Sequence, residues 1–166
     1  LKITFCYISL QNIHKLLTDH EQNKDWSKMY VAFQNICKSK AFKKLTKKIG
    51  IDLIITPWDE KSVIFIKKLG VKFLKIASID ANNFHFCDYV ARQKLPTIIS
   101  TGMCTYNEIL KTQKIFKKYK TKHIFLHCTS AYPSDEKDKH LNCIPKLRKI
   151  LKSDVGFSGH GTGLTG

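Results

Sequence analysis

Five apolar segments of this chain each end in a short cluster of side chains that could bind a substrate or transfer a proton. The clusters occupy residues 54–59, 75–80, 98–103, 127–133 and 158–163. The last cluster, Ser158-Gly159-His160-Gly161-Thr162-Gly163, holds a histidine among small residues. Lysine and hydroxyl groups can donate to the oxygens of an anion, and imidazole is a common metal ligand. One polar cluster per strand end is how a parallel α/β protein assembles a site on one face.

The elements that must position these clusters follow from the hydrophobic pattern. Apolar strands are predicted to begin near residues 51, 72, 96, 123 and 154, with a helical period in each interval. Asp59 and Asn82-Asn83 are the expected caps of the first two helices, and Gly70 the expected end of the first. Thr105 to Glu108 reads as a capping box for the third helix. Near-continuous apolar strands that alternate with helices indicate a parallel sheet built from right-handed βαβ units.

The fourth helix is predicted from Leu141, Ile144, Leu147 and Leu151, which share one helical face. Pro145 fits this helix only if it lies in the first turn, because proline removes a backbone donor and clashes further along.

The spacing of the repeats predicts the fold class, an α/β protein with a parallel (β/α)₈ TIM barrel. Successive strands begin 21 to 31 residues apart, as in such barrels. A complete barrel needs about 250 residues, so a chain of 166 residues is expected to hold five to six units, a partial barrel over residues 41–166. Residues 1–40 are left unassigned, although Ile3–Ile8 could add a strand. A doubly wound open sheet fits composition and spacing almost as well, but no Gly-rich phosphate turn follows any strand.

Composition and charge narrow the classes of function. The formal net charge is +16, which invites a nucleic-acid interpretation, but all except two of the 29 basic residues are lysines. Base recognition favours arginine, so we expect no specific nucleic-acid partner. No apolar run approaches the roughly 18 residues that a membrane helix requires, and no membrane partner is expected. Six cysteines without a CxxC pair predict reduced thiols, no structural zinc and a cytoplasmic location.

Four motifs, in order and at fitting spacing, resemble the sialic acid synthase (N-acetylneuraminate synthase) family. They are LGVKFLKIASIDANNF, PTIISTGMCTYNEI, IFLHCTSAYPSDEKDKHLNCIP and VGFSGHGTG. The resemblance covers residues 42–163, and the CTSAYP and SGH-x-TG segments are similar to animal members.

The resemblance implies a reaction, cofactors and partners. Enzymes of this family condense phosphoenolpyruvate with N-acetylmannosamine or its 6-phosphate and release phosphate. A divalent metal, Mn²⁺ or Mg²⁺, is implied as the Lewis acid that polarises the sugar aldehyde. The family also implies a homodimer, in which an antifreeze-like domain after the barrel caps the partner's site.

Matching residues carry the implied roles. The positions implied to bind phosphoenolpyruvate are Lys75, Ser78, Ser100 and Ser158. Those implied to contact the sugar are Thr56, Ser130 and Tyr132. Lys75 and Asp80 are the implied catalytic residues, Asp80 as a proton carrier, and His160 is the implied metal ligand. From the residues alone, Lys75 could be a solvent-facing lysine at a strand end, Asp80 a helix cap or turn residue, and Tyr132 a packing residue.

The chain also departs from the family pattern. Ile79 stands where the family has Gly, and a β-branched residue tolerates positive φ poorly. Lys75 and Ser78 differ in strand parity, so they share a site only if the strand ends or bulges between them. The family's first substrate-binding Glu and Lys cannot be found in residues 1–40, and one histidine makes no tight metal site. We therefore expect a fragment with negligible turnover by itself. The alternatives are a non-catalytic remnant that acts as a binding or interaction protein, and a basic nucleic-acid-associated domain.

Overall fold

The computed structural model describes residues 5–7, 48 and 52–161. Within these residues, six strands form one sheet in the order β1-β2-β3-β4-β5-β6, and every neighbouring pair is parallel. The strands are β1 Phe5–Tyr7, β2 Asp52–Ile55, β3 Phe73–Ile76, β4 Thr97–Ser100, β5 His123–Cys128 and β6 Val155–Ser158. The helices are α4 Glu60–Lys68, α5 Phe84–Arg92, α6 Tyr106–Lys118 and α7 Cys143–Leu151, with short 3₁₀ turns η1 Ser78–Asp80 and η2 Glu136–Asp138.

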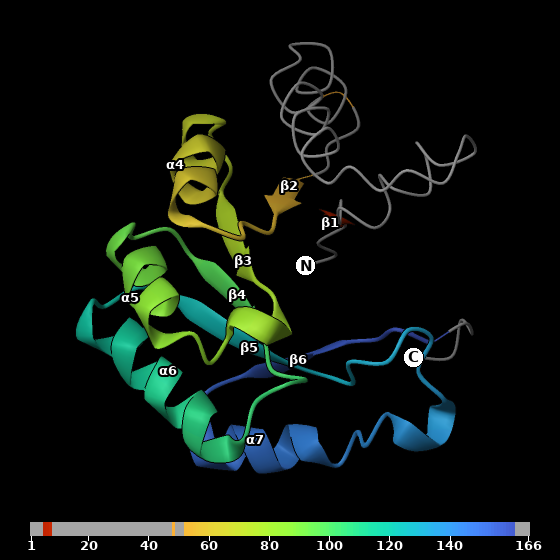
Figure 1. Cartoon of the computed structure of the whole chain (residues 1–166). Helices are drawn as coiled ribbons and strands as arrows, with labels where there is room; N and C mark the ends of the chain where they lie inside the picture. Colours follow the sequence, from red (N-terminus) through yellow and green to blue (C-terminus); the bar gives the residue numbers. More distant parts are fainter. Residues whose placement is uncertain (1–4, 8–47, 49–51, 162–166) are drawn as a thin grey trace.

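The order of the strands confirms the expected α/β class and the barrel type. A doubly wound sheet reverses its strand order part-way along the chain, whereas here each strand adds to the same side of the one before it. Figure 1 shows α4, α5, α6 and α7 one after another along one face of this sheet. The strand expected at Ile3–Ile8 is present as β1 in its described part. The remainder of the unassigned segment 1–40 lies outside the described residues.

The helix ends have the predicted caps. The side chain of Asp59 accepts a hydrogen bond from the backbone N–H of Ser62 at 2.6 Å, and Asn83 does the same for Phe86 at 3.2 Å. Thr105 and Glu108 form a complete capping box at the start of α6. Hydrogen bonds from the backbone and side chain of Thr105 hold the pKa of the Glu108 carboxyl below its usual value.

The prediction for the last helix was wrong at its first residue. Leu141 precedes α7 and is 47% exposed, so it does not belong to the buried face formed by Leu147 and Leu151. The reason is Pro145, which is tolerated only in the first turn of a helix. The helix therefore begins at Cys143, with the proline as its third residue.

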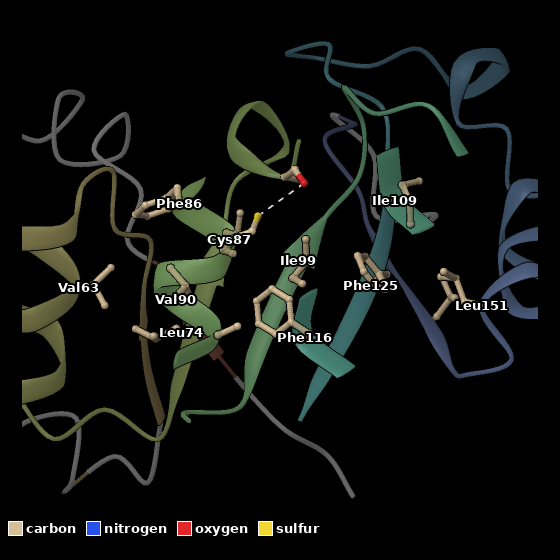
Figure 2. Packing of buried hydrophobic residues seen from close by; sticks show 14 of the residues in the cluster. Val63, Leu74, Phe86, Cys87, Val90, Ile99, Ile109, Phe116, Phe125 and Leu151 are labelled. Atoms are coloured by element: carbon tan, nitrogen blue, oxygen red, sulfur yellow. Dashed lines mark hydrogen bonds between the residues drawn. The ribbon is translucent and has the colours of Figure 1, made fainter. Parts of the chain in front are cut away.

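The two faces of the sheet differ in what they bury. One face packs against the helices, and its strand residues include Leu74, Ile76, Ile99, Phe125 and Val155, all buried in one apolar cluster. Figure 2 shows members of this cluster between the strands and the helices. Because side chains alternate along a strand, the other face takes the intervening residues. We call it the inner face.

No helix in the described part of the chain has the length and apolar character needed to cross a membrane.

Candidate active site

Strand register places three of the predicted site residues on the inner face. Lys75 pairs with Ile98, which lies two residues before Ser100. The ladder connects Ser100 through β5 to Gly156, two residues before Ser158. Residues two apart on a strand point to the same side, and registered residues of neighbouring strands do so too. Lys75, Ser100 and Ser158 therefore lie on one face, on three strands.

Three buried polar atoms at the carboxyl ends of the strands lack a hydrogen-bond partner among the described residues. They are Thr56 Oγ1 after β2, Asp80 Oδ2 after β3 and Ser100 Oγ at the end of β4. Buried polar groups in native proteins are nearly always paired, because leaving one unpaired costs free energy. Three unpaired polar atoms at one edge of the sheet offer hydrogen-bonding groups to a polar ligand.

Asp80 is a turn residue and not the cap of a helix. It ends η1, whereas the side chain that caps α5 belongs to Asn83. Burial raises the pKa of the Asp80 carboxyl above its usual value, and a hydrogen bond with Asn83 partly opposes this. A carboxyl group with a raised pKa takes up a proton more readily near neutral pH, as a proton carrier must.

Lys75 is buried, with 9% of its surface exposed, so it is not a solvent-facing lysine at the end of a strand. Burial of the imidazole lowers the pKa of His160, and the positive charge of Lys75 lowers it further. His160 is therefore held in its neutral form, which is the form that can bind a metal.

Tyr132 lies against His160 and does not pack into the core. Its side chain is 65% exposed, and its hydroxyl is 3.3 Å from Nε2 of His160. Ser130 lies in the same loop and is exposed. Thr56 and Ser158 lie at the same edge of the sheet, and Thr56 Oγ1 has no hydrogen-bond partner among the described residues.

The opposite strand parity of Lys75 and Ser78 is resolved by the end of the strand between them. Strand β3 ends at Ile76, and Ser78 begins η1. Ser78 Oγ accepts a hydrogen bond from the N–H of Gly102 at 3.1 Å and lies 3.1 Å from Sγ of Cys128. Cys128 is not among the site residues predicted from the sequence. No local signal in the sequence identifies it, because the register that places it beside Ser158 on the inner face is a property of the folded sheet.

Ile79 causes no backbone strain in η1. It is absent from the positive-φ residues of the described chain, so the Gly that the family has here is not needed for backbone conformation. Ile79 is 55% exposed and precedes the half-buried Asp80.

The described residues do not by themselves fit a complete metal site. Nowhere among them do three or more His, Cys, Asp or Glu side chains gather closely enough to hold an ion. His160 is the one ligand that the resemblance implies among these residues, and a catalytic zinc-type site takes about three protein ligands.

The sequence of the chain is similar to those of known enzymes. A model of the NeuB family matches residues 10–166. N-acetylneuraminate-9-phosphate synthase of Drosophila melanogaster is 34% identical over 161 residues, 95% of this chain and 41% of that protein. Pseudaminic acid synthase of Campylobacter jejuni is 39% identical over 115 residues, 69% of this chain and 34% of that protein. The chain thus spans well under half the length of these relatives.

Solved structures agree with the fold. A sialic acid synthetase from Leptospira borgpetersenii superposes with a TM-score of 0.74 at 28% identity, over 93% of this chain and 53% of that one. A phospho-2-dehydro-3-deoxyheptonate aldolase from Thermotoga maritima superposes with a TM-score of 0.54 at 15% identity, over 64% of this chain and 32% of that one. The second likeness supports the fold alone.

Proposed function

The chain belongs to the NeuB family, and from that premise we propose that it provides the phosphoenolpyruvate-binding part of a sialic acid synthase-type active site. In the proposed reaction the enol carbon of phosphoenolpyruvate attacks the aldehyde carbon of N-acetylmannosamine or its 6-phosphate, and a C–C bond forms. Water adds at the carbon that bears the phosphate, and phosphate leaves by cleavage of the C–O bond. Because a pseudaminic acid synthase is also a relative, a different acceptor sugar is the alternative to N-acetylmannosamine.

The observation that carries this proposal is the set of unpaired polar atoms beside a buried lysine at one edge of the sheet. Lys75 offers an ammonium group on the inner face, and Ser100 offers a buried hydroxyl without a partner among the described residues. An anion with several oxygens fits these groups, since lysine neutralises charge and hydroxyls donate without adding any. In the proposal, Lys75, Ser78, Ser100 and Ser158 hold phosphoenolpyruvate.

The remaining roles follow from chemistry at the same edge. Asp80, with its raised pKa, carries a proton to or from the reacting atoms, together with the ammonium of Lys75. Thr56, Ser130 and Tyr132 contact the acceptor sugar. His160 contributes one ligand to a divalent cation, Mn²⁺ or Mg²⁺, with the other ligands outside the described residues. Mn²⁺ should then broaden the NMR signals around His160, and His160→Ala should abolish this broadening.

The direct test is calorimetric titration of the purified chain with phosphoenolpyruvate. We expect binding, and we expect Lys75→Met to weaken it about tenfold or more, because a charge-assisted hydrogen bond is lost. Lys122→Met is the matched control, since this exposed lysine precedes β5 on the chain. Equal affinity of the Lys75→Met chain and the unsubstituted chain would refute the proposed site.

Turnover separates the proposed enzyme from a non-catalytic remnant. Release of inorganic phosphate is measured with phosphoenolpyruvate, N-acetylmannosamine or its 6-phosphate, and Mn²⁺. We expect binding of phosphoenolpyruvate but only background turnover from these 166 residues, and full turnover from a longer protein that contains them. Binding without turnover in such a longer protein would favour the remnant.

A further inference from the structure

The hydroxyl of Ser78 has two fixed neighbours. The backbone N–H of Gly102 donates to Ser78 Oγ at 3.1 Å, and Sγ of Cys128 lies 3.1 Å from the same oxygen on the inner side of β5. Cys128 is 4% exposed and a free thiol. Three segments, η1, the end of β4 and the end of β5, thus meet at one serine oxygen.

The numbers of donor protons and acceptor lone pairs restrict the direction of the hydrogen bonds at Ser78 Oγ. A serine hydroxyl has one O–H and two acceptor lone pairs, and a backbone N–H can only donate. Gly102 therefore occupies one lone pair of Ser78. Cys128 can either take the serine proton or donate its own S–H to the second lone pair. If Ser78 donates to sulfur, a weak acceptor, it has no proton left for a ligand.

We propose that Cys128 is a positioning residue, which donates its S–H to Ser78 Oγ and so leaves the Ser78 O–H directed at a bound carboxylate or phosphate oxygen. With both lone pairs occupied, the O–H is the one remaining direction in which Ser78 can form a hydrogen bond. An anionic oxygen is a far stronger acceptor than a thiol, so anion binding favours this arrangement. The inference rests on the proposed function, since it names how one residue of that site is held.

Two further thiols hold the backbone of the same turn. Sγ of Cys104 donates to the carbonyl of Ser78 at 3.7 Å, and Sγ of Cys87 donates to the carbonyl of Asp80 at 3.4 Å. Figure 2 shows the second bond of Cys87, to the carbonyl of Ala81 at 3.6 Å, as a dashed line. Burial raises the pKa of Cys87 to about 12 and that of Cys104 to about 11, so these two thiols stay protonated donors.

The first experiment reads the thiol proton directly by infrared spectroscopy of the S–H stretching band. The difference between the unsubstituted chain and Cys128→Ala isolates the Cys128 band, and we expect it at the position of a hydrogen-bonded donor. The same difference in a Ser78→Ala background should move to the position of a free thiol. A Cys128 band that Ser78→Ala leaves in place would overturn the proposal.

The second experiment measures the affinity for phosphoenolpyruvate by calorimetry. Cys128→Ala should weaken binding about tenfold, and Cys128→Ser should restore most of it, because a hydroxyl can also donate to Ser78. Cys143→Ala is the matched control, because this half-buried thiol lies at the start of α7 and contacts Tyr106. A merely structural role would affect Cys128→Ala and Cys128→Ser through the free energy of unfolding, which urea denaturation measures separately.

The outcomes distinguish this inference from the proposed function. Unchanged affinity in a folded Cys128→Ala chain overturns the role of Cys128 while the proposed function stands. If the unsubstituted chain binds no phosphoenolpyruvate, the proposed function fails, and the infrared comparison alone then decides whether Cys128 donates to Ser78.

Discussion

The rings of Tyr132 and His160 contact each other beyond the ends of β5 and β6, tilted by 45° with centroids 4.3 Å apart, and the tyrosine hydroxyl lies 3.3 Å from Nε2 of the histidine. A backbone hydrogen bond of 3.0 Å, from the N–H of Ser134 to the carbonyl of His160, joins the same two segments. The loop after β5 and the loop after β6 therefore form one unit. A ligand group that contacts the exposed Tyr132 is brought beside His160 as well.

The first prediction concerns the pKa of His160. Burial is the larger cause of its lowered pKa, and the positive charge of Lys75 is the second. Lys75→Met removes that charge and should raise the pKa of His160 toward its usual value without fully restoring it. The measurement is an NMR titration of the His160 imidazole in the presence of a chelator. Lys122→Met is the control, and an unchanged pKa in Lys75→Met would contradict the placement of Lys75.

The same lowered pKa has a consequence for stability. Above the ordinary histidine pKa the imidazole is neutral in the folded and the unfolded chain, so it has no effect on the free energy of unfolding. As the pH falls below that value, the unfolded chain takes up a proton that the folded chain still resists. Stability should decrease through this interval, which begins near pH 6.5. Lys75→Met should shrink the part of this decrease that His160 causes.

The second prediction compares two glycines that resist substitution for different reasons. A Cβ at Gly102 would lie 2.6 Å from Oγ of Ser130 and 2.7 Å from the carbonyl of Cys128, so Gly102→Ala should cost about 1–3 kcal/mol through overpacking. Gly70 has open space but a φ of +76°, and Gly70→Ala should cost about 1–2 kcal/mol through the left-handed backbone. Urea denaturation measures both.

Further variants separate the two causes. Gly70→Asn should cost less than Gly70→Ala, because asparagine tolerates the left-handed region. Ser130→Gly should relieve part of the cost of Gly102→Ala, because it removes the nearest clashing atom. If Ser130→Gly does not reduce the loss of stability in Gly102→Ala, the clash with Ser130 Oγ is not the cause of that loss.

The sequence was sufficient to predict the strands and helices and the edge of the sheet at which the polar clusters lie. Strand positions, the caps Asp59 and Asn83 and the Thr105–Glu108 capping box all follow from local patterns, because caps act within one turn of a helix. The polar clusters could also be predicted to share an edge, because parallel strands end on the same side.

Contacts between strand ends could not be predicted, because they depend on register and on where each strand stops. The sequence leaves open whether the strand ends or bulges between Lys75 and Ser78, and β3 ends at Ile76. Cys128 meets Ser78 across 50 residues of sequence, and no local pattern encodes that contact. The effect of Ile79 could not be predicted for a related reason, since only the structure shows that the 3₁₀ turn at this point requires no positive φ.

The third prediction compares two buried threonines whose hydroxyls differ in hydrogen bonding among the described residues. Thr56 Oγ1 has no hydrogen-bond partner among the described residues, whereas Thr112 Oγ1 donates to the carbonyl of Ala81 at 2.6 Å. Thr56→Val should stabilise the ligand-free chain by about 1 kcal/mol, because it removes an unpaired buried hydroxyl. Thr112→Val should destabilise it by about 1 kcal/mol, because the carbonyl loses its donor. Urea denaturation supplies both values, and calorimetry with N-acetylmannosamine should show weaker binding for Thr56→Val alone. A Thr56→Val chain that loses stability would mean that this hydroxyl is already paired, and the argument from unpaired atoms at the strand ends would lose one of its three members.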